Sequence, residues 1–204
     1  MVKNTISNEV LNELPLQHFE GEIVLVEHED GIAQVMKEVE GETVVGFDTE
    51  TRPSFKKGVT NSIALFQLST KDSTYLIRLN KTGVPESLKG LLEDESVLKV
   101  GVGIRDDIRG LQKLVPFKPQ GFVELQSLAI EKGLKDFSLK KLAGILLKFR
   151  VSKRQRLSNW EAETLSKAQM VYAATDSWVA LEIYKKLLVL DSSKVIDVEI
   201  ENQQ

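Results

Sequence analysis

A short apolar run that ends in two carboxylates constrains the fold of this chain more than any other feature. Val44-Val45-Gly46-Phe47 is apolar at successive positions, which is typical of a strand covered by helices on both faces. Because side chains alternate along a strand, Asp48 and Glu50 are expected on one face, at the rim of the sheet. Two like charges this close resist joint ionisation unless a cation or hydrogen-bond donors lie between them. The pair therefore indicates either a solvated strand end or a site for a hard cation such as Mg²⁺ or Mn²⁺.

Strands and helices alternate along the chain around this run. The short turn Lys71-Asp72-Ser73 predicts an antiparallel hairpin, and the order of elements is typical of an α/β layer with a mixed sheet. We expect an N-terminal arm at residues 1–20, a single domain at 21–190 and a C-terminal tail at 191–204. Hydrophobic periodicity predicts strands at 22–27, 43–49, 62–70, 74–79, 97–102 and 121–125, and helices at 29–40, 84–93, 105–115 and from 126 onward, ending in a long helix at about 161–190.

Composition excludes several kinds of site. The 204 residues are 42% hydrophobic and 28% charged, as in an ordinary globular domain. The absence of cysteine excludes disulfides, thiolate zinc sites and cysteine nucleophiles, and His18 and His28 alone do not make a histidine-rich metal site. Any metal would therefore be held by carboxylates. No apolar run approaches the ~20 residues of a membrane helix, and the first residues lack the apolar segment of a secretory signal, so we expect a cytoplasmic protein with no membrane partner.

Basic residues gather in one part of a chain whose net charge is only −3. No acid occurs between Asp136 and Glu161, whereas lysine and arginine recur there. Such a band can follow the phosphates of a nucleic acid, but it also fits a solvated helix face that runs into a loop. The loop at 50–61, directly beyond the carboxylate pair, carries further basic residues.

The helix expected at 105–115 carries an acid on the face that should be buried. Asp107 lies within the apolar stripe that contains Leu111 and Leu114, whereas Asp106 lies on the side expected to face solvent. Acids are favoured in the first turn of any helix, so capping alone would explain the presence of either residue. Capping does not explain why the inward position is charged.

The long C-terminal helix shows the same anomaly. Tyr172 and Asp176 lie one turn apart in the middle of its predicted buried stripe. A buried, isolated carboxylate is costly and normally neutralises unless it finds a partner. That partner would be a lysine or arginine, backbone donors, or a metal shared with Asp48 and Glu50, whereas Tyr172 alone also fits a core aromatic with a satisfied hydroxyl. The rest of the stripe comprises Leu165, Ala168, Val179, Ile183, Leu187 and Leu190.

Together these motifs resemble those of the Asp-Glu-Asp-Asp 3′-5′ exonucleases. Phe47-Asp-Thr-Glu50 resembles the first exonuclease motif, Gly101-Val-Gly-Ile-Arg-Asp-Asp107 the second and Tyr172-Ala-Ala-Thr-Asp176 the third. The tyrosine of the third motif is typical of the tyrosine subclass (DEDDy), which includes ribonuclease D and the Werner-type exonucleases. Phe122-Val-Glu-Leu125 and Ser158-Asn-Trp160 are most similar to the Werner-type branch, and the resemblance spans roughly residues 20–190.

The resemblance implies a ribonuclease H-like fold, with a mixed five-stranded sheet that is flanked by helices and has an antiparallel second strand. It also implies two divalent metal ions, Mg²⁺ or Mn²⁺, which bind the attacking and leaving oxygens of a phosphodiester in line. Asp48, Glu50 and Asp176 would hold the first ion, and Asp48 would bridge to a second, with Asp107 contributing through coordinated water. Tyr172 would orient or deprotonate the attacking water.

The activity that the resemblance implies is hydrolysis from the 3′ end of nucleic acid, DNA rather than RNA, with a preference for single-stranded or frayed ends. Two alternatives remain: a catalytically silent nucleic-acid-binding or scaffolding module of the same fold, and an endonuclease with similar carboxylates. Intact buried acids disfavour the silent module, because an unused cluster would only destabilise it. The residues expected to contact nucleic acid are Arg52, Phe55, Lys56, Lys57, Arg150, Lys153, Arg154 and Arg156.

Overall fold

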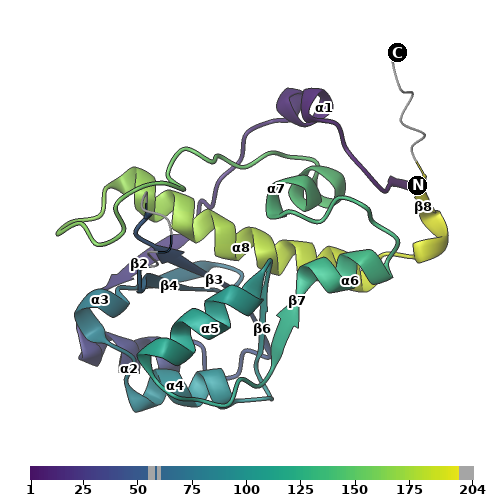
Figure 1. The fold of residues 1–204 in the computed structure, drawn as a ribbon. Coiled ribbons are helices and arrows are strands. Elements are labelled where there is room, and N and C mark those ends of the chain that lie inside the picture. The colour runs from purple at the N-terminus through teal and green to yellow at the C-terminus, as the bar shows by residue number, and fades with distance from the viewer. Residues whose placement is uncertain (55–57, 59–60, 198–204) are drawn as a thin grey trace.

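A mixed sheet forms the centre of the computed structural model, which describes residues 1–54, 58 and 61–197 (Figure 1). Its strand order is β2-β5-β4-β3-β6-β7. β4 runs antiparallel to β3 and β5, whereas the pairs β2–β5, β3–β6 and β6–β7 are parallel. The strands are β2 (Glu22–Val26), β3 (Val44–Thr51), β4 (Ile63–Ser69), β5 (Ser73–Ile77), β6 (Leu98–Gly101) and β7 (Phe122–Glu124).

The predicted α/β class with a mixed sheet and the hairpin at residues 71–73 are confirmed, but the expected count of five strands is wrong. The sheet has six strands, because β2 pairs in parallel with β5 from Glu22↔Ser73 to Val26↔Ile77. Without β2, the edge of β5 would expose a row of unpaired backbone groups. In the remaining five strands the second along the chain, β4, is the antiparallel one, as expected.

Helices cover both faces of the sheet, so that β3 is buried between two layers. Figure 1 shows α8 crossing one face, with α2, α4 and α5 on the other. Phe47 and Phe66 pack with residues of α2, α4 and α5 in one core, while Val179 and Ile183 of α8 belong to another. The helices are α1 (Asn8–Glu13), α2 (Glu29–Glu38), α3 (Leu79–Thr82), α4 (Glu86–Glu93), α5 (Ile104–Leu114), α6 (Leu125–Glu131), α7 (Leu139–Leu142), which continues into a π-helix η1 (Ala143–Leu147), α8 (Lys167–Val189) and a 3₁₀-helix η2 (Ser192–Lys194).

The long helix begins later than expected, at Lys167, and residues 148–166 form no helix. Ser166 and Gln169 make a capping box that fixes this start. The backbone N–H of Gln169 donates to Ser166 Oγ (3.2 Å), and the backbone N–H of Ser166 donates to Gln169 Oε1 (3.0 Å). Ala168, which the sequence places in the buried stripe, is therefore in the first turn and exposed, because the preceding segment does not cover it. Tyr172 and Asp176 are buried as expected.

The first twenty residues lie against the domain at several points. β1 (Val2–Lys3) pairs in parallel with β8 (Val195–Ile196), so the N-terminus lies beside the C-terminal segment (Figure 1). Further along, Leu11 and Phe19 are buried, and the Phe19 amide donates to Thr175 Oγ1 of α8 (3.1 Å). The division into an arm at 1–20, a domain at 21–190 and a tail at 191–204 stays a prediction. In the described part of the chain, none of the helices combines the length and apolarity that a bilayer crossing demands.

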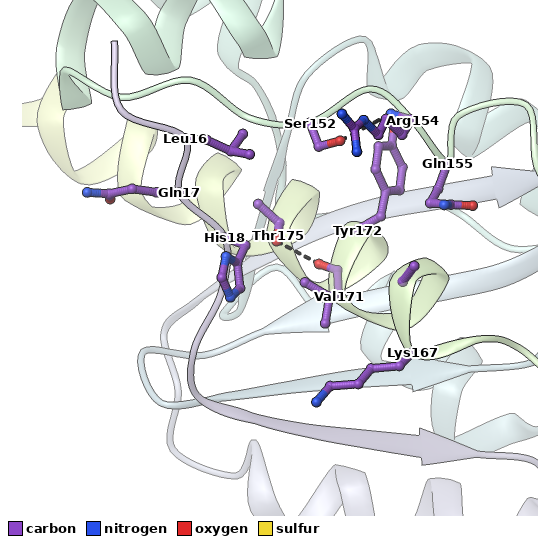
Figure 2. Close-up of a pocket in the computed structure, with 11 residues that line it drawn as sticks. Leu16, Gln17, His18, Ser152, Arg154, Gln155, Lys167, Val171, Tyr172 and Thr175 are labelled. Atoms are coloured by element: carbon purple, nitrogen blue, oxygen red, sulfur yellow. Dashed lines mark hydrogen bonds between the residues drawn. The ribbon is translucent and has the colours of Figure 1, made fainter.

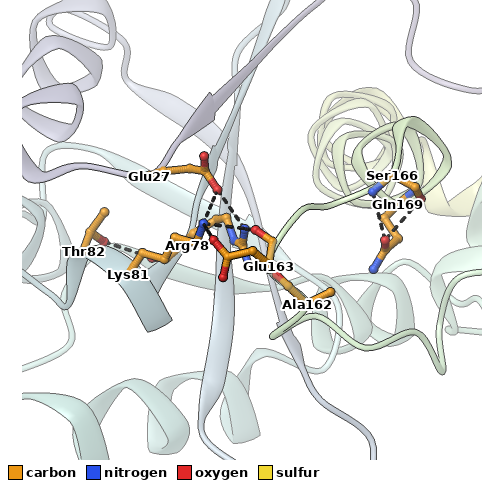
Figure 3. Close-up of polar contacts among 8 residues, drawn as sticks. All are labelled: Glu27, Arg78, Lys81, Thr82, Ala162, Glu163, Ser166 and Gln169. Atoms are coloured by element: carbon orange, nitrogen blue, oxygen red, sulfur yellow. Dashed lines mark hydrogen bonds and ion pairs between the residues drawn. The ribbon is translucent and has the colours of Figure 1, made fainter.

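A fully buried arginine fastens the segment before α8 to the sheet. Arg78, at the end of β5, donates from Nη1 to Glu27 Oε1 (2.7 Å) and to the Glu163 carbonyl (2.8 Å), and from Nη2 to the Ala162 carbonyl (Figure 3). Lys81 adds a contact to Glu27 Oε1 (2.9 Å). Because the tied carbonyls lie just before the capping box, this cluster fixes where α8 enters the molecule.

Replacement of Arg78 by methionine should lower the free energy of unfolding by about 3 kcal/mol, because buried carbonyls and Glu27 lose a charged donor. Urea denaturation followed by circular dichroism measures this change. Lys89→Met is the matched control: its ion pair with Glu86 lies at the surface, and the expected change is below about 0.5 kcal/mol. Equal effects of the two substitutions would contradict a structural role for Arg78.

Candidate active site

The end of β3 carries Asp48 and Glu50 on the face turned toward α8. Val45 and Phe47 point to the opposite core, so the alternation places Gly46, Asp48 and Glu50 together under the helix. Among the described residues, β6 pairs with β3 only at Val44–Gly46. The part of β3 that bears the two acids therefore has one free edge, which leaves their carboxylates accessible at the rim of the sheet.

A direct contact between backbones brings α8 to this strand. A Cβ atom at Gly46 would lie 2.0 Å from the carbonyl oxygen of Ser177, so only glycine permits the observed packing. The Ser177 hydroxyl hydrogen-bonds Ser69 Oγ of β4 at 2.7 Å. Because Asp176 precedes Ser177, the contact delivers its carboxylate to the rim that holds Asp48.

Asp176 and Tyr172 occupy one face of α8, with 7% and 9% of their surfaces exposed. The Tyr172 hydroxyl donates a hydrogen bond to the Asp176 carboxylate. The Tyr172 ring also packs near the buried ring of Trp160, at 6.0 Å between centroids. Burial raises the pKa of Tyr172 above its usual value, and the charges of Asp176 and Glu50 raise it further. The phenol is therefore a hydrogen-bond donor in this structure.

Asp107 reaches the rim from α5, in the opposite layer. Its carboxylate accepts a hydrogen bond from Thr49 Oγ1, between the two acids of β3. Asp106 instead faces solvent and pairs with Arg109 at 3.3 Å. The start of α5 is fixed by Glu124, whose carboxylate accepts from the amides of Gly103 and Ile104, both at 2.9 Å.

Burial raises the proton affinity of all four acids, and repulsion from the other acids adds to it at Asp48 and Glu50. Burial, followed by repulsion from Asp176, Asp107 and Glu50, raises the pKa of Asp48 well above its usual value. Burial and the charges of Asp176 and Asp107 raise the pKa of Glu50 to about 9. Burial likewise raises the pKa of Asp107 to about 6 and that of Asp176 to about 7. Full ionisation of the four carboxyl groups at this rim is therefore unfavourable in the protein alone.

The donor chemistry of this cluster suits divalent metal ions, although the side chains are not arranged as a finished chelate. Across the described residues, no three acidic or histidine side chains converge as metal ligands do. None of the four carboxylates forms an ion pair with a described residue, and carboxylate oxygens are the ligands of hard cations such as Mg²⁺ and Mn²⁺. A cation would relieve the repulsion and draw the carboxylates toward a common point. The residues that could hold it are Asp48, Glu50, Asp107 and Asp176.

The basic segment after η1 divides between several tasks. Lys153 and Arg156 line a pocket of about 320 Å³ with Asp48, Tyr172 and Asp176. Lys153 favours the charged form of Asp176, and Arg156 does the same for Glu50, so both cations lie close to the acids.

The other predicted contacts with nucleic acid lie elsewhere. Arg150 Nε donates to the Leu14 carbonyl at 3.0 Å and thereby holds the N-terminal residues. Arg52 is exposed and pairs with Glu161 at 3.4 Å, next to Glu50 in a second hollow of about 960 Å³. Arg154 lines a different pocket. Phe55, Lys56 and Lys57 lie outside the described residues.

Sequence reasoning missed four residues that build the site. Gly46 and Ser177 set the distance between strand and helix, Thr49 anchors Asp107, and Glu124 fixes the start of α5. A glycine in an otherwise apolar strand signals a close backbone approach, so Gly46 could have been singled out. The other three act through contacts between segments distant in sequence, for which the chain offers no local signal.

Comparison with known proteins decides the family. Residues 23–190 match the model of the 3′-5′ exonuclease family. The chain belongs to this family. Its membership confirms the resemblance to the Asp-Glu-Asp-Asp exonucleases and the prediction of a 3′-5′ exonuclease, a phosphodiesterase hydrolase.

Two curated relatives illustrate the similarity of this exonuclease chain. It is 39% identical over 150 residues to the bifunctional 3′-5′ exonuclease/ATP-dependent helicase WRN of Mus musculus, covering 71% of the chain and 11% of that protein. It is 36% identical over 163 residues to a 3′-5′ exonuclease of Arabidopsis thaliana, covering 76% of the chain and 56% of that protein. The chain therefore corresponds to one part of each of these longer relatives.

Solved structures confirm the ribonuclease H-like fold of the exonuclease domain. The Aedes aegypti Nibbler EXO domain superposes with a TM-score of 0.77 at 23% identity, covering 87% of this chain and 96% of that domain. Escherichia coli RNase D superposes with a TM-score of 0.76 at 23% identity, covering 82% of this chain and 44% of that structure. At this identity the likeness establishes the fold alone.

Replacement of Gly46 by alanine should lower the free energy of unfolding by about 2 kcal/mol or more, because α8 must move away from β3. Gly90→Ala is the control: nothing lies within 4 Å of its added Cβ, and this position in α4 should gain up to about 1 kcal/mol. Chemical denaturation in chelator compares both variants without any metal contribution. A Gly46→Ala protein as stable as wild type would refute the close contact.

Proposed function

We propose that this chain is a metal-dependent exonuclease of the tyrosine subclass that releases mononucleotides from the 3′ end of nucleic acid by a two-metal mechanism. The observation that carries the proposal is that four carboxyl groups without an ion pair to a described residue lie beside one buried tyrosine at a free sheet edge. Structural ion-pair networks also shift pKa values, but they neutralise their acids, and these acids form no ion pair with a described residue.

Each residue takes a definite part in the proposed reaction. Asp48, Glu50 and Asp176 would hold one divalent ion. Asp48 would also bind a second ion, to which Asp107 would contribute through coordinated water. The ions, Mg²⁺ or Mn²⁺, would supply the activation of water and the stabilisation of the leaving oxygen. The Tyr172 hydroxyl, fixed by Asp176 and by its packing, would hold the attacking water in line with the phosphorus atom.

The proposed substrate is a single-stranded or frayed 3′ end, DNA rather than RNA. Lys153 and Arg156 line the same pocket as Asp48 and Asp176, where they would neutralise the phosphate at the cleavage position. The pocket of about 320 Å³ has room for one nucleotide rather than a base pair, which favours an end that is already unpaired. The preference for DNA rests on the sequence similarity to the Werner-type exonuclease.

The test uses single-stranded DNA and RNA oligonucleotides labelled at either end and incubated with Mg²⁺ or Mn²⁺. A 3′ label should appear at once in a mononucleotide, while a 5′ label should pass through a ladder of shortening products. Asp48→Ala and Asp176→Ala should lower the rate at least roughly 10³-fold, since each removes a charge that the transition state requires. Asp106→Ala, which changes the solvent-facing neighbour of Asp107, should keep the activity.

Stability in chelator separates loss of chemistry from loss of fold. Asp48→Ala and Asp176→Ala should melt at or above the temperature of wild type, because each removes one of several mutually repelling charges. Internal cuts by the wild-type protein would favour an endonuclease. Intact oligonucleotides with both metals would favour a silent binding module, and either result would overturn the proposal.

A further inference from the structure

A second pocket shares Tyr172 with the pocket that contains Asp48 and Asp176. It has a volume of about 430 Å³ and is enclosed by residues 16–18, by the loop at 152–155 and by the first turns of α8 (Figure 2). We call it the arm pocket. Tyr172 and Ser152 line both this pocket and the one that contains Asp48 and Asp176, so the two hollows adjoin.

The lining of the arm pocket is selective in charge. Although the chain has 30 acids and 27 basic residues, none of the described residues that line the pocket is an acid. Arg154 and Lys167 do, from the loop and from the first turn of α8, and neither forms an ion pair with a described residue. Leu16, Ala168 and Val171 supply apolar surface between them. A ligand that fits must combine an anionic group with a flat or apolar part.

The walls of the pocket are fixed by hydrogen bonds rather than left as loose loops. The Arg150 amide donates to the Pro15 carbonyl (2.9 Å), and the Gln17 amide donates to the Arg150 carbonyl (3.0 Å). Thr175 Oγ1 accepts from the Phe19 amide and donates to the Val171 carbonyl at 2.6 Å (Figure 2). These bonds tie residues 15–19 to the basic loop and to α8, so the hollow is preformed.

One wall of the pocket lies outside the residues that match the family model. The matched region begins at residue 23, whereas Leu16, Gln17 and His18 precede it. Ala168 also lines the pocket. Its small side chain is exposed because α8 begins only at Lys167. The acids at the rim of the sheet therefore do not account for this wall of the pocket.

We propose that the arm pocket binds one nucleotide unit, with its phosphate near Lys167 and its base against Leu16, Ala168 and Val171, while Arg154 adds positive charge from another side of the pocket (Figure 2). The inference rests on the proposed function, since cleavage beside Tyr172 places nucleotides directly next to the pocket. The unit comes either from the strand that enters the catalytic site or from the released nucleoside 5′-monophosphate. Both sources present the same anionic phosphate and flat base.

The experiment measures binding in EDTA, where no hydrolysis occurs. One arm uses fluorescence anisotropy of a 5′-fluorescein single-stranded oligodeoxynucleotide, and the other uses calorimetric titration with adenosine 5′-monophosphate. Lys167→Glu reverses one charge in the lining of the arm pocket. Ala168→Leu places a larger, uncharged side chain of similar helix propensity in the pocket. Each should raise the dissociation constant roughly three- to tenfold.

Lys186→Glu is the matched control. It makes the same charge change near the other end of α8, at an exposed lysine that does not line the pocket, and should change binding less than roughly twofold. Weaker binding of the monophosphate by Lys167→Glu and Ala168→Leu assigns the pocket to the released nucleotide, and weaker binding of the oligonucleotide alone assigns it to the strand. Both results support the inference.

The inference is overturned if both ligands bind the Lys167→Glu protein at least as tightly as the Lys186→Glu protein. It is also overturned if the Ala168→Leu protein binds both ligands with the dissociation constants of wild type. This outcome is distinct from failure of the proposed function. A wild-type protein that cleaves nothing with Mg²⁺ or Mn²⁺, yet shows these binding changes, would retain the arm pocket and lose the nuclease assignment. A protein that cleaves normally without these changes would do the reverse.

Discussion

The contact of Gly46 with the Ser177 carbonyl is the constraint on which the rest of the site depends. The backbones of β3 and α8 meet here without an intervening side chain. Asp48 lies two residues after Gly46 on the strand, and Asp176 lies directly before Ser177 on the helix. The strand supplies Asp48 and Glu50, and the helix supplies Tyr172 and Asp176. A helix held one side chain further away would leave these groups as separate surface or core residues with no shared chemistry.

That packing assembles groups that repel one another, and the fold must hold them together from outside. Several interactions do so at the edges of the site. Arg78 fixes the entry to α8, Glu124 fixes the start of α5, and Thr49 anchors Asp107. Burial of these acids without a cation lowers the stability of the fold. The two hydrophobic cores on either side of the sheet offset this loss. Divalent ions would convert this unfavourable cluster into a favourable one, which is the physical basis of the proposed metal dependence.

The sequence predicts those parts of the site that follow from local periodicity. Alternation along β3 places Asp48 and Glu50 on one face, and the helical stripes distinguish Asp107 from Asp106 and bury Asp176. The sequence predicts the start of α8 too early, because the apolar spacing before residue 167 resembles that of a helix. The capping box at Ser166 sets the true start at Lys167. Arg150 stays a predicted contact for nucleic acid. The hydrogen bond from its Nε to the Leu14 carbonyl has no local signature in the sequence, because it joins distant segments. The strand at 22–27 is predicted, but neither its parallel pairing with β5 nor the arm pocket, whose walls come from distant segments, has a local signature.

Anomalous diffraction from a crystal of the protein soaked in Mn²⁺ tests the central claim most directly. Two manganese peaks should appear at the rim of the sheet, one bound by Asp48, Glu50 and Asp176 and the other beside Asp48 and Asp107, with the carboxylates turned toward them. A rim without manganese at a concentration that supports cleavage, or manganese bound only elsewhere on the surface, would contradict the assignment of these acids as the metal ligands.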